Sequence, residues 1–571
     1  MVDAINRRTA LTAGIAATVT SCGGSPKTTP FVAVSEGAKG VFSHGVASGD
    51  PQSDSIVIWT RVTVDAAGPV TVVWETAADR DFTDMRGKGE TTTSAARDWT
   101  VKHVLRGLQP GETLYYRFRV GDAYSPVGRT RTLPVGAVDE ARFAVISCSN
   151  YPFGFFNVYD LIARREDLTA VLHLGDYIYE YSTEDYGGAV GKSLGRNHQP
   201  AHEIITLADY RMRHAQYKSD PASQAMHAAH PMIDIWDDHE TSNDSWKGGA
   251  ENHQEDEGAW EDRRRAALQA YYEWMPVRDP EPGRPAEALF RAYDIGDLLT
   301  LTAIETRLMA RARQFEFTDV LATLKTPEDL DRFKNEILWD TSREMLGAAQ
   351  LAYIENVFRT GADKPWRLVA NQIIMAKVTQ PDLTPHVTEE DIVALEKEWK
   401  QGRAFVETSN LGLPSNFDAW DGYPAARERF YDMARATSDS AMIVVTGDTH
   451  TWWANDLTAK DGGHMGVELG VNSVTSPSPY AKSFLGGRGA EYALLTNREN
   501  PDVRYLSGED HGYIDLKITA DRARAEYVAV DTIERGSYNA FTKVAFNIKR
   551  GRKGATFAGA DGLTLKERFL F

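Results

Sequence analysis

The chain has 571 residues and a formal net charge of −18, with 42% hydrophobic, 10% aromatic and 25% charged residues. This composition is typical of a globular protein of several domains and excludes a chain that is disordered as a whole. Beyond the first thirty residues no run of 18 apolar residues occurs, which excludes a membrane span there. The acidic balance also argues against nucleic acid as a binding partner, because such proteins need a basic surface.

Residues 1–21 have the layout of an export signal. Arg7 and Arg8 precede a short apolar run, an arrangement typical of twin-arginine export. Small residues precede Cys22, as at a bacterial lipoprotein cleavage site, which predicts acylation of Cys22 and a polar tether over residues 22–39. We therefore expect an exported protein, periplasmic, anchored to the outer membrane by this lipid alone, or extracellular. A disordered start and a Cys22–Cys148 disulfide are the alternatives.

Residues 40–134 contain short strand-like runs separated by turns. The clearest run is 113–120, where apolar and polar residues alternate as in a half-buried antiparallel strand. Further runs are 55–60, 70–75 and 99–104. Repeated short strands predict a small immunoglobulin- or fibronectin-like β-sandwich domain, which more often positions or shields a site than reacts.

Residues 140–545 have a different pattern, with apolar runs that do not alternate. The runs are 143–146, 170–174, 232–236, 368–370 and 442–445, and helical stretches are expected at 155–165, 203–214 and 256–274. Continuous apolar strands are covered on both faces, so this order predicts an α/β domain with a largely parallel sheet. We expect residues 546–571 to form a C-terminal tail.

A side chain that can bind a metal follows each of these five runs. In chain order these side chains are Cys148, Asp176, Asp238, Asn371 and Asp448, with His450 two residues further on. Ligands of parallel sheets bind at the carboxyl ends of the strands, so we expect the six along one edge. Carboxylates packed together repel one another unless a cation lies among them.

The donor types predict two adjacent metals of unlike character. Thiolate from Cys148 and phenolate from Tyr179, three residues after Asp176, are strong donors to a trivalent ion such as Fe³⁺. The oxygen donors suit Ca²⁺, Mg²⁺ or Mn²⁺. Paired metals hold the attacking and leaving oxygens of a phosphoryl displacement, which predicts hydrolysis of phosphate esters by attack of a metal-bound hydroxide.

These residues lie in motifs that resemble those of the alkaline phosphatase D (PhoD) family, metallophosphoesterases related to purple acid phosphatases. The motifs are GDYIYE at 175–180, WDDHE at 236–240, GDTH at 447–450, SCSNYP at 147–152, and FSHGVASGD and WTRV at 42–50 and 59–62. The resemblance covers about residues 40–530. It implies a metallophosphoesterase-type αββα sandwich behind the small β-sandwich domain, and alkaline phosphatase activity on small phosphate esters.

The resemblance also implies roles for single residues. Iron(III) is implied at Cys148, Asp176, Tyr179 and His450, and calcium at Asp176, Asp238, Asn371 and Asp448, while other divalent metals also fit these donors. Asn243 and Asp244 are candidates for a further calcium. His239 is expected against the substrate phosphate or leaving group, with a structural histidine as the alternative. Arg307 and Asn150 are candidates for substrate contact, with a surface arginine and a loop-capping asparagine equally open.

Two other functions fit the same residues: a phosphodiesterase or phospholipase-D-like hydrolase, and a non-catalytic, lipid-anchored metal-binding surface protein. We expect the long insertions 184–202 and 314–340 to shape the entrance, so the natural substrate does not carry over from the family. His227 and His230 are expected on a helix surface rather than at a zinc site, and residues 390–400 are expected to form a solvated amphipathic helix.

Overall fold

The computed structural model describes residues 41–481, 487–551 and 554–564. The predicted export signal, residues 1–21, and the predicted tether, residues 22–39, therefore lie outside the described residues, as does Cys22. Within the described parts of the chain, no helix has the length and apolar character needed to cross a membrane.

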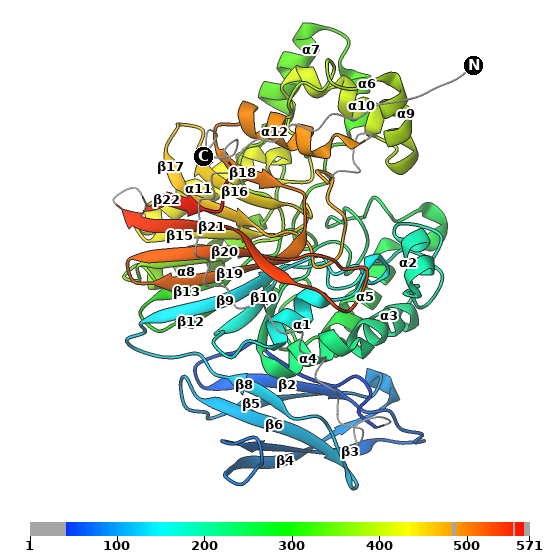
Figure 1. Cartoon of the computed structure of the whole chain (residues 1–571), viewed down its shortest axis with the longest axis vertical. Helices are drawn as coiled ribbons and strands as arrows, with labels where there is room; N and C mark the ends of the chain where they lie inside the picture. Colours follow the sequence, from blue (N-terminus) through cyan, green and yellow to red (C-terminus); the bar gives the residue numbers. More distant parts are fainter. Residues whose placement is uncertain (1–40, 482–486, 552–553, 565–571) are drawn as a thin grey trace, which may run out of the picture.

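Two large sheets form the centre of the molecule (Figure 1). In the described residues the larger sheet has ten strands, in the order β22 (Gly554–Asp561), β21 (Ala540–Gly551), β20 (Arg522–Val530), β19 (His511–Thr519), β9 (Glu140–Ile146), β10 (Ala170–His173), β11 (Pro231–Asp234), β1 (Val46–Gly49), β2 (Ser55–Arg61) and β5 (Thr100–Arg106). The second, also counted over those residues, has seven strands, in the order β12 (Arg291–Ile295), β13 (Leu299–Ala303), β14 (Trp366–Ala370), β15 (Ala441–Thr446), β17 (His464–Gly470), β16 (Trp452–Thr458) and β18 (Val503–Ser507).

Alternating side chains of β15 pack on the two faces of its sheet. Ile443 and Val445 belong to the core shared with the ten-stranded sheet, whereas Met442 and Val444 pack in a second core. That second core includes side chains of α8 (Gly347–Thr360) and α11 (Pro424–Thr437). The strands of the seven-stranded sheet are thus buried on both faces, which explains their continuous apolar runs.

Helices cover the other face of the ten-stranded sheet. Side chains of α1 (Asn157–Ala163), α3 (Leu207–Ser219), α4 (Pro221–Ala229) and α5 (Trp260–Trp274) belong to its core. A capping box between Thr206 and Asp209 starts α3, because each side chain accepts a backbone N–H of the first turn. Helix, sheet, sheet and helix therefore follow one another, which confirms the predicted αββα sandwich.

The prediction that the apolar runs form a single, largely parallel sheet is wrong in the number of sheets. The five runs form β9, β10 and β11 in one sheet and β14 and β15 in the other. Within each group the strands are parallel neighbours, so their carboxyl ends do share an edge. A strand buried on both faces carries no pattern that identifies its sheet, which is why the sequence does not separate the groups.

The N-terminal region has its own core but is not a separate unit. A five-stranded sheet, as described, contains β4 (Met85–Thr93), β3 (Val70–Ala77), β6 (Thr113–Val120), β7 (Ala123–Tyr124) and β8 (Gly128–Arg131). The opposite strands β1, β2 and β5 extend the ten-stranded sheet instead, because β1 pairs in parallel with β11 through Ser48 and Gly49. β4 has no counterpart among the runs expected from the sequence, since its residues are mostly polar or glycine.

The prediction that residues 546–571 form a C-terminal tail is wrong for the residues that belong to β21 and β22. Strands β21 and β22 pair with each other and extend the large sheet beside β20. Phe546 and Ile548 are buried in the central core. Their alternation with Asn547 and Lys549 is the period-two signal of a strand with one buried face, and residues 565–571 lie outside the described residues.

Among the described residues, five helices form the end of the molecule farthest from the N-terminal strands (Figure 1). They are α6 (Phe317–Thr323), α7 (Pro327–Arg332), α9 (Glu389–Glu398), α10 (Gly402–Glu407) and α12 (Gly489–Glu499). Two of them, α6 and α7, come from the insertion 314–340, and α2 (Gly188–Leu194) comes from the other insertion. α9 agrees with the amphipathic helix predicted at 390–400, because Leu395 is buried while Val393 and Glu390 are exposed.

A candidate metal centre between the two sheets

The loops after the strands meet where the two sheets face each other. The backbone N–H of Cys148 donates to the carbonyl of Gly175 at 3.1 Å, which ties the loop after β9 to the loop after β10. A Cβ on Gly447 would lie 2.7 Å from the side chain of Ser147. The loop after β15 therefore touches the loop after β9 across the two sheets, and only glycine allows this approach.

Four of the predicted ligands have left-handed backbone conformations. Their φ angles are +61° at Cys148, +56° at Asp176, +62° at Asp448 and +52° at His450. Residues other than glycine adopt this region at a cost in free energy, and such residues concentrate at functional sites. The strained conformation turns each side chain out of the direction of its strand, and it is a signal independent of residue type.

Cys148, Asp176, Tyr179 and His450 form the first part of the cluster. Ligand atoms of Cys148, Asp176 and His450 lie within 4.8 Å of one another. The Tyr179 hydroxyl donates to the carboxylate of Asp176 at 3.0 Å and lies 3.3 Å from Nε2 of His450. Burial, with the nearby Asp176, raises the pKa of the Cys148 thiol well above its usual value, so a thiolate at this position requires a cation.

Nδ1 of His450 lies 2.9 Å from the carbonyl oxygen of Pro477. A carbonyl can only accept, so Nδ1 carries the proton and Nε2 keeps its lone pair toward Tyr179. Burial also lowers the pKa of His450 to about 3, which keeps the ring neutral. A neutral imidazole with a fixed tautomer is the form that binds a metal.

Carboxylates form the second part of the cluster. Ligand atoms of Asp237, Asp238 and Asp448 lie within 4.8 Å of one another, and Asp176 and Asp238 belong to a further such group with His239. Burial, with Asp237 as a neighbour, raises the pKa of Asp448 well above its usual value. Oδ1 of Asp176 and Oδ2 of Asp237 are buried and accept no hydrogen bond from the described residues. The cluster therefore has oxygen lone pairs that a cation would satisfy.

Arg307 is the positive side chain inside this acidic group. It is fully buried, and its guanidinium donates to Asp237, to both oxygens of Asp418 at 2.7 and 2.8 Å, and to Asp448 at 3.2 Å. The alternative of a surface arginine is therefore wrong. Because its donors face carboxylates, Arg307 offsets part of their repulsion and orients them.

His239 is held by a glutamate. Its Nδ1 lies 2.7 Å from Oε2 of Glu180, and its ring stacks on Tyr179 with centroids 4.2 Å apart. Burial lowers the pKa of His239, but Asp238 and Glu180 outweigh it and the pKa lies well above the usual value. The neighbouring carboxylates thus favour the protonated ring, with Nδ1 fixed by Glu180 and Nε2 available to a ligand.

A cavity of about 630 Å³ lies beside the cluster. His239, Asp244, Asp448 and His450 line one part of its wall. Aromatic rings line another part: Phe317, Trp399, Phe405, Trp453, Tyr480 and Tyr492. The cavity thus joins charged donors to an apolar surface, the combination typical of small-molecule sites.

Two family descriptions match the chain. The description PhoD-like phosphatase matches residues 143–527, and PhoD-like phosphatase, N-terminal domain, matches residues 27–134. The chain belongs to the PhoD-like phosphatase family. It is similar to alkaline phosphatase D of Bacillus subtilis (strain 168), at 34% identity over 533 residues, 90% of this chain and 82% of that protein.

A solved structure described as the structure of PhoD superposes with a TM-score of 0.73 at 29% identity, over 93% of this chain and 96% of that one. As a PhoD-like phosphatase, the chain is a hydrolase of phosphoric esters. The resemblance to this family on the motifs at 147–152, 175–180, 236–240 and 447–450 is confirmed.

Two asparagines predicted for this PhoD-like phosphatase have no described contact with the cluster. The amide of Asn371 donates to the carbonyl of Ile373, and its oxygen accepts from the indole of Trp420 at 3.3 Å. Asn150 is fully buried, and neither amide atom has a hydrogen-bond partner among the described residues. Their roles as calcium ligand and substrate contact stay predictions.

The two residues proposed for a further calcium both line the cavity, but their hydrogen-bond partners differ. Asp244 lines the cavity, its backbone N–H donates to Asp238 at 2.6 Å, and burial raises the pKa of its carboxyl well above the usual value. Asn243 also lines the cavity, and its amide donates to Glu251 at 3.3 Å. Both residues are placed to face a ligand, and their calcium role stays a prediction.

Sequence reasoning missed four acidic residues of the site: Asp237 of the carboxylate group above, Glu240, Glu180 and Asp418. Glu240 accepts backbone N–H groups of Asp176, Tyr177 and Asp237, at 3.2, 2.5 and 2.9 Å, and so fixes two ligand loops. Glu180 holds His239. Both glutamates lie inside the motifs at 175–180 and 236–240. Their position close to predicted ligands is the sequence signal that could have identified them. Asp418, which pairs with Arg307, lies in no motif, and only the fold shows its role.

The prediction that His227 and His230 lie on a helix surface is wrong. Both are buried at 1% exposure. His227 contacts the hydroxyl of Tyr177 at 3.0 Å and Nζ of Lys218 at 2.8 Å, and Nε2 of His230 bonds to the carbonyl of Ile162 at 2.9 Å. Neither belongs to a metal-binding group among the described residues, so both are structural.

Replacing Glu180 with glutamine tests how His239 is held. We expect kcat/KM to fall about 10- to 100-fold, as for other residues that orient catalytic side chains. Because the negative charge of Glu180 raises the pKa of His239, its loss lowers that pKa, and the alkaline limb of the rate profile moves to lower pH. Glu184→Gln is the control, because Glu184 is exposed and, among the described residues, its carboxylate pairs with Lys192 alone. An unchanged pH profile in Glu180→Gln would contradict this role.

Proposed function

We propose that this chain is an exported, metal-dependent hydrolase of phosphate esters, an alkaline phosphatase, that uses iron(III) and calcium. The observation that carries the proposal is the meeting of a buried thiol, a phenol, a neutral imidazole and several carboxylates at one point between the sheets. A protein stabilised by ordinary packing would not gather these groups, because buried carboxylates without a counter-charge destabilise the fold.

The donor set supports two unlike ions. Cys148, Asp176, Tyr179 and His450 would hold iron(III), since thiolate, phenolate and imidazole are strong donors. Asp238 and Asp448 would hold calcium with Asp176 and Asn371, through oxygen alone. When bound, such ions polarise the phosphoryl oxygens and lower the pKa of water.

His239 is the residue we assign to proton transfer. With Nδ1 bonded to Glu180, its Nε2 is the side of the ring left for the substrate. When protonated, the ring can donate a hydrogen bond to a phosphoryl oxygen or a proton to the departing ester oxygen. Glu180 stabilises the positive charge of the ring until the proton is transferred. Arg307 acts through the carboxylates that it orients, and is therefore a positioning residue.

The aromatic part of the cavity supports a substrate with an apolar organic group. Trp399 follows α9, Phe405 lies on α10, and Tyr492 lies on α12. Their rings would cover the group attached to the phosphate while the acidic wall faces the phosphate and its ions. The volume of about 630 Å³ exceeds that of a small phosphate monoester, which favours phosphodiester hydrolysis as a second candidate function of the same residues.

Removing the proposed iron ligands tests the metal centre. We expect Cys148→Ala and Asp176→Asn each to lower kcat about a hundredfold or more, and to lose bound iron and the phenolate–iron(III) absorption band together. Elemental analysis, visible spectroscopy and hydrolysis of phenyl phosphate measure the three properties. The control is Asp122→Asn, an exposed aspartate of the N-terminal region. Loss of the band with unchanged hydrolysis would refute the assignment, and metal binding by the parent without turnover would favour the binding protein.

A change in the aromatic wall tests the substrate class. We expect Trp399→Ala to raise KM about tenfold for phenyl phosphate, because an apolar contact is lost, and to leave methyl phosphate unchanged. Trp74→Ala in the five-stranded sheet removes the same side chain away from the cavity and is the control. Rates of the parent on phenyl phosphate and on methyl phenyl phosphate compare monoester with diester. Equal effects of Trp399→Ala on phenyl and methyl phosphate would contradict the proposed subsite.

The proposals of export and of membrane anchoring are based on residues 1–39. Arg7 and Arg8 support export, and Cys22 supports a lipid anchor. We expect Arg7→Lys with Arg8→Lys to retain the protein in the cytoplasm. We expect Cys22→Ala to release the exported protein from the membrane fraction, because the lipid would be its sole anchor. Cell fractionation with activity measurements checks both. Membrane association that persists in Cys22→Ala would contradict the lipid anchor.

A further inference from the structure

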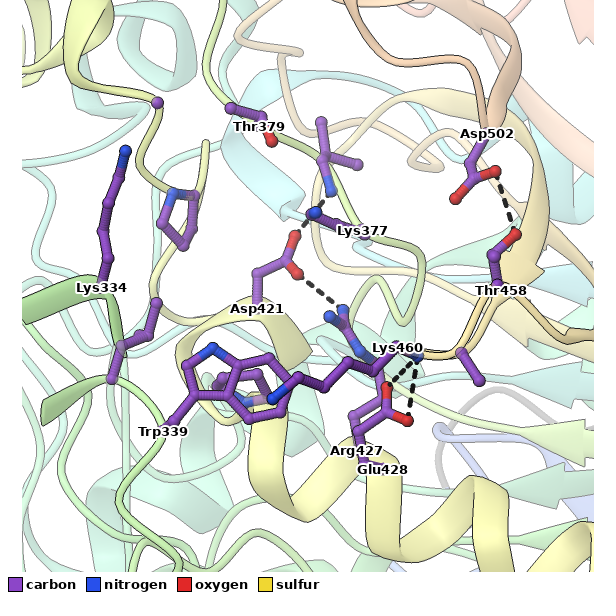
Figure 2. A pocket seen from close by; sticks show the side chains of 17 residues that line it. Lys334, Trp339, Lys377, Thr379, Asp421, Arg427, Glu428, Thr458, Lys460 and Asp502 are labelled. Atoms are coloured by element: carbon purple, nitrogen blue, oxygen red, sulfur yellow. Dashed lines mark hydrogen bonds and ion pairs between the residues drawn. The ribbon is translucent and has the colours of Figure 1, made fainter. Parts of the chain in front are cut away.

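A second pocket, of about 460 Å³, lies next to the cavity beside the metal cluster but has a different lining. Figure 2 shows the side chains that line this second pocket. Val378 and Asp421 line both spaces, so the segment after β14 and the turn before α11 form the partition between them. None of the proposed metal ligands lines the second pocket. Its chemistry is therefore independent of the metal centre.

Lysine side chains enter this pocket from three separate segments of an otherwise acidic chain (Figure 2). Lys334 comes from the helical turn Phe333–Ile337, Lys377 follows β14, and Lys460 follows β16. In the part of the chain that the structure describes, none of the three has a carboxylate oxygen within 4.0 Å. Lys377 lies near enough to Asp502 to lower its pKa, although burial dominates and raises it.

The acidic side chains of the pocket are already engaged by other groups. Asp421 accepts from Arg427 at 2.6 Å and from the backbone N–H of Val378 at 2.7 Å. Glu428 accepts the backbone N–H of Lys460 at 3.1 Å, and Asp502 accepts the hydroxyl of Thr458 at 3.0 Å. These bonds orient the three carboxylates, and among the described residues none of them forms a close ion pair with a lysine of the pocket.

Two further features make the pocket more than a group of surface lysines. Arg427 is 4% exposed and lines the pocket, and its guanidinium donates to Asp421 and to the carbonyl of Met375. These bonds hold a fourth positive side chain at the pocket wall. Nζ of Lys460 lies 3.9 Å from the centroid of the Trp339 ring, which fixes that ammonium group at the pocket wall.

We infer that this pocket is a second anion site that binds a phosphate group away from the metal centre. Lysine ammonium groups on three sides suit a tetrahedral oxyanion, because each is a compact charge with three donors that can turn toward different oxygens. Inorganic phosphate, the product of the proposed reaction, has this chemistry, and so does a phosphate carried on a larger organic molecule. A single substrate spanning both spaces is disfavoured, because the Asp421 carboxylate lies in the partition.

Equilibrium dialysis of the metal-loaded protein with radiolabelled inorganic phosphate tests the inference. We expect two bound phosphates in the parent, one at the metals and one in the pocket. The triple variant Lys334→Ala, Lys377→Ala, Lys460→Ala should weaken the pocket site about tenfold or more and keep the other. A matched triple variant, Lys88→Ala, Lys517→Ala, Lys549→Ala, changes the net charge equally at lysines of β4, β19 and β21, which do not line the pocket, and should keep both sites.

The Asp448→Asn variant separates this inference from the proposed function. It should lose the phosphate at the metal centre and keep the phosphate in the pocket. The inference would be overturned if the pocket variant still bound two phosphates with the affinity of the parent. It would also be overturned if the matched variant lost as much phosphate affinity as the pocket variant. Displacement of the pocket phosphate by methylphosphonate would identify a site for organic phosphates, and resistance to it a site for the free ion.

Discussion

Negative charge buried between two β-sheets is the constraint on which the rest of this structure depends. Asp176, Asp237 and Asp238 are buried, Asp448 beside them is partly buried at the cavity wall, and an ionised carboxylate in such surroundings costs several kcal/mol unless it is paired. The surrounding residues meet this cost in part through Arg307. They leave buried carboxylate oxygens without hydrogen bonds, and those oxygens are the donors that metal ions prefer.

The same constraint explains why so much of the site consists of residues that hold other residues. Glu240 fixes the loops after β10 and β11 through three backbone N–H groups. Pro477 sets the tautomer of His450, and Glu180 sets the orientation and charge of His239. Left-handed conformations at Cys148, Asp176, Asp448 and His450 are retained because these contacts over-determine them. Preorganisation of this kind lets the site act without rearranging when charge develops on the substrate.

The two pockets are lined largely by segments other than those that carry the metal cluster. The loops after the strands carry the family motifs, whereas α6, α10, α12 and the end of α9 supply much of the aromatic wall of the cavity and the turn Phe333–Ile337 supplies Lys334 of the second pocket. Chemistry and selectivity are thus located on different parts of the chain. This arrangement is common where a fixed scaffold carries variable loops.

The sequence by itself determined the residue types of the site, the strands that precede them and the family. Ligand-capable side chains at the ends of apolar runs are a local signal, and so are the motifs around Asp176, Asp238 and Asp448. Only the tertiary structure decided that the five runs belong to two sheets, that β21 and β22 extend the core, and that Asp418 reaches Arg307 from 111 residues away. The physical reason is that periodicity reports whether a face is buried, but not against which partner, and long-range pairing of charges leaves no local pattern.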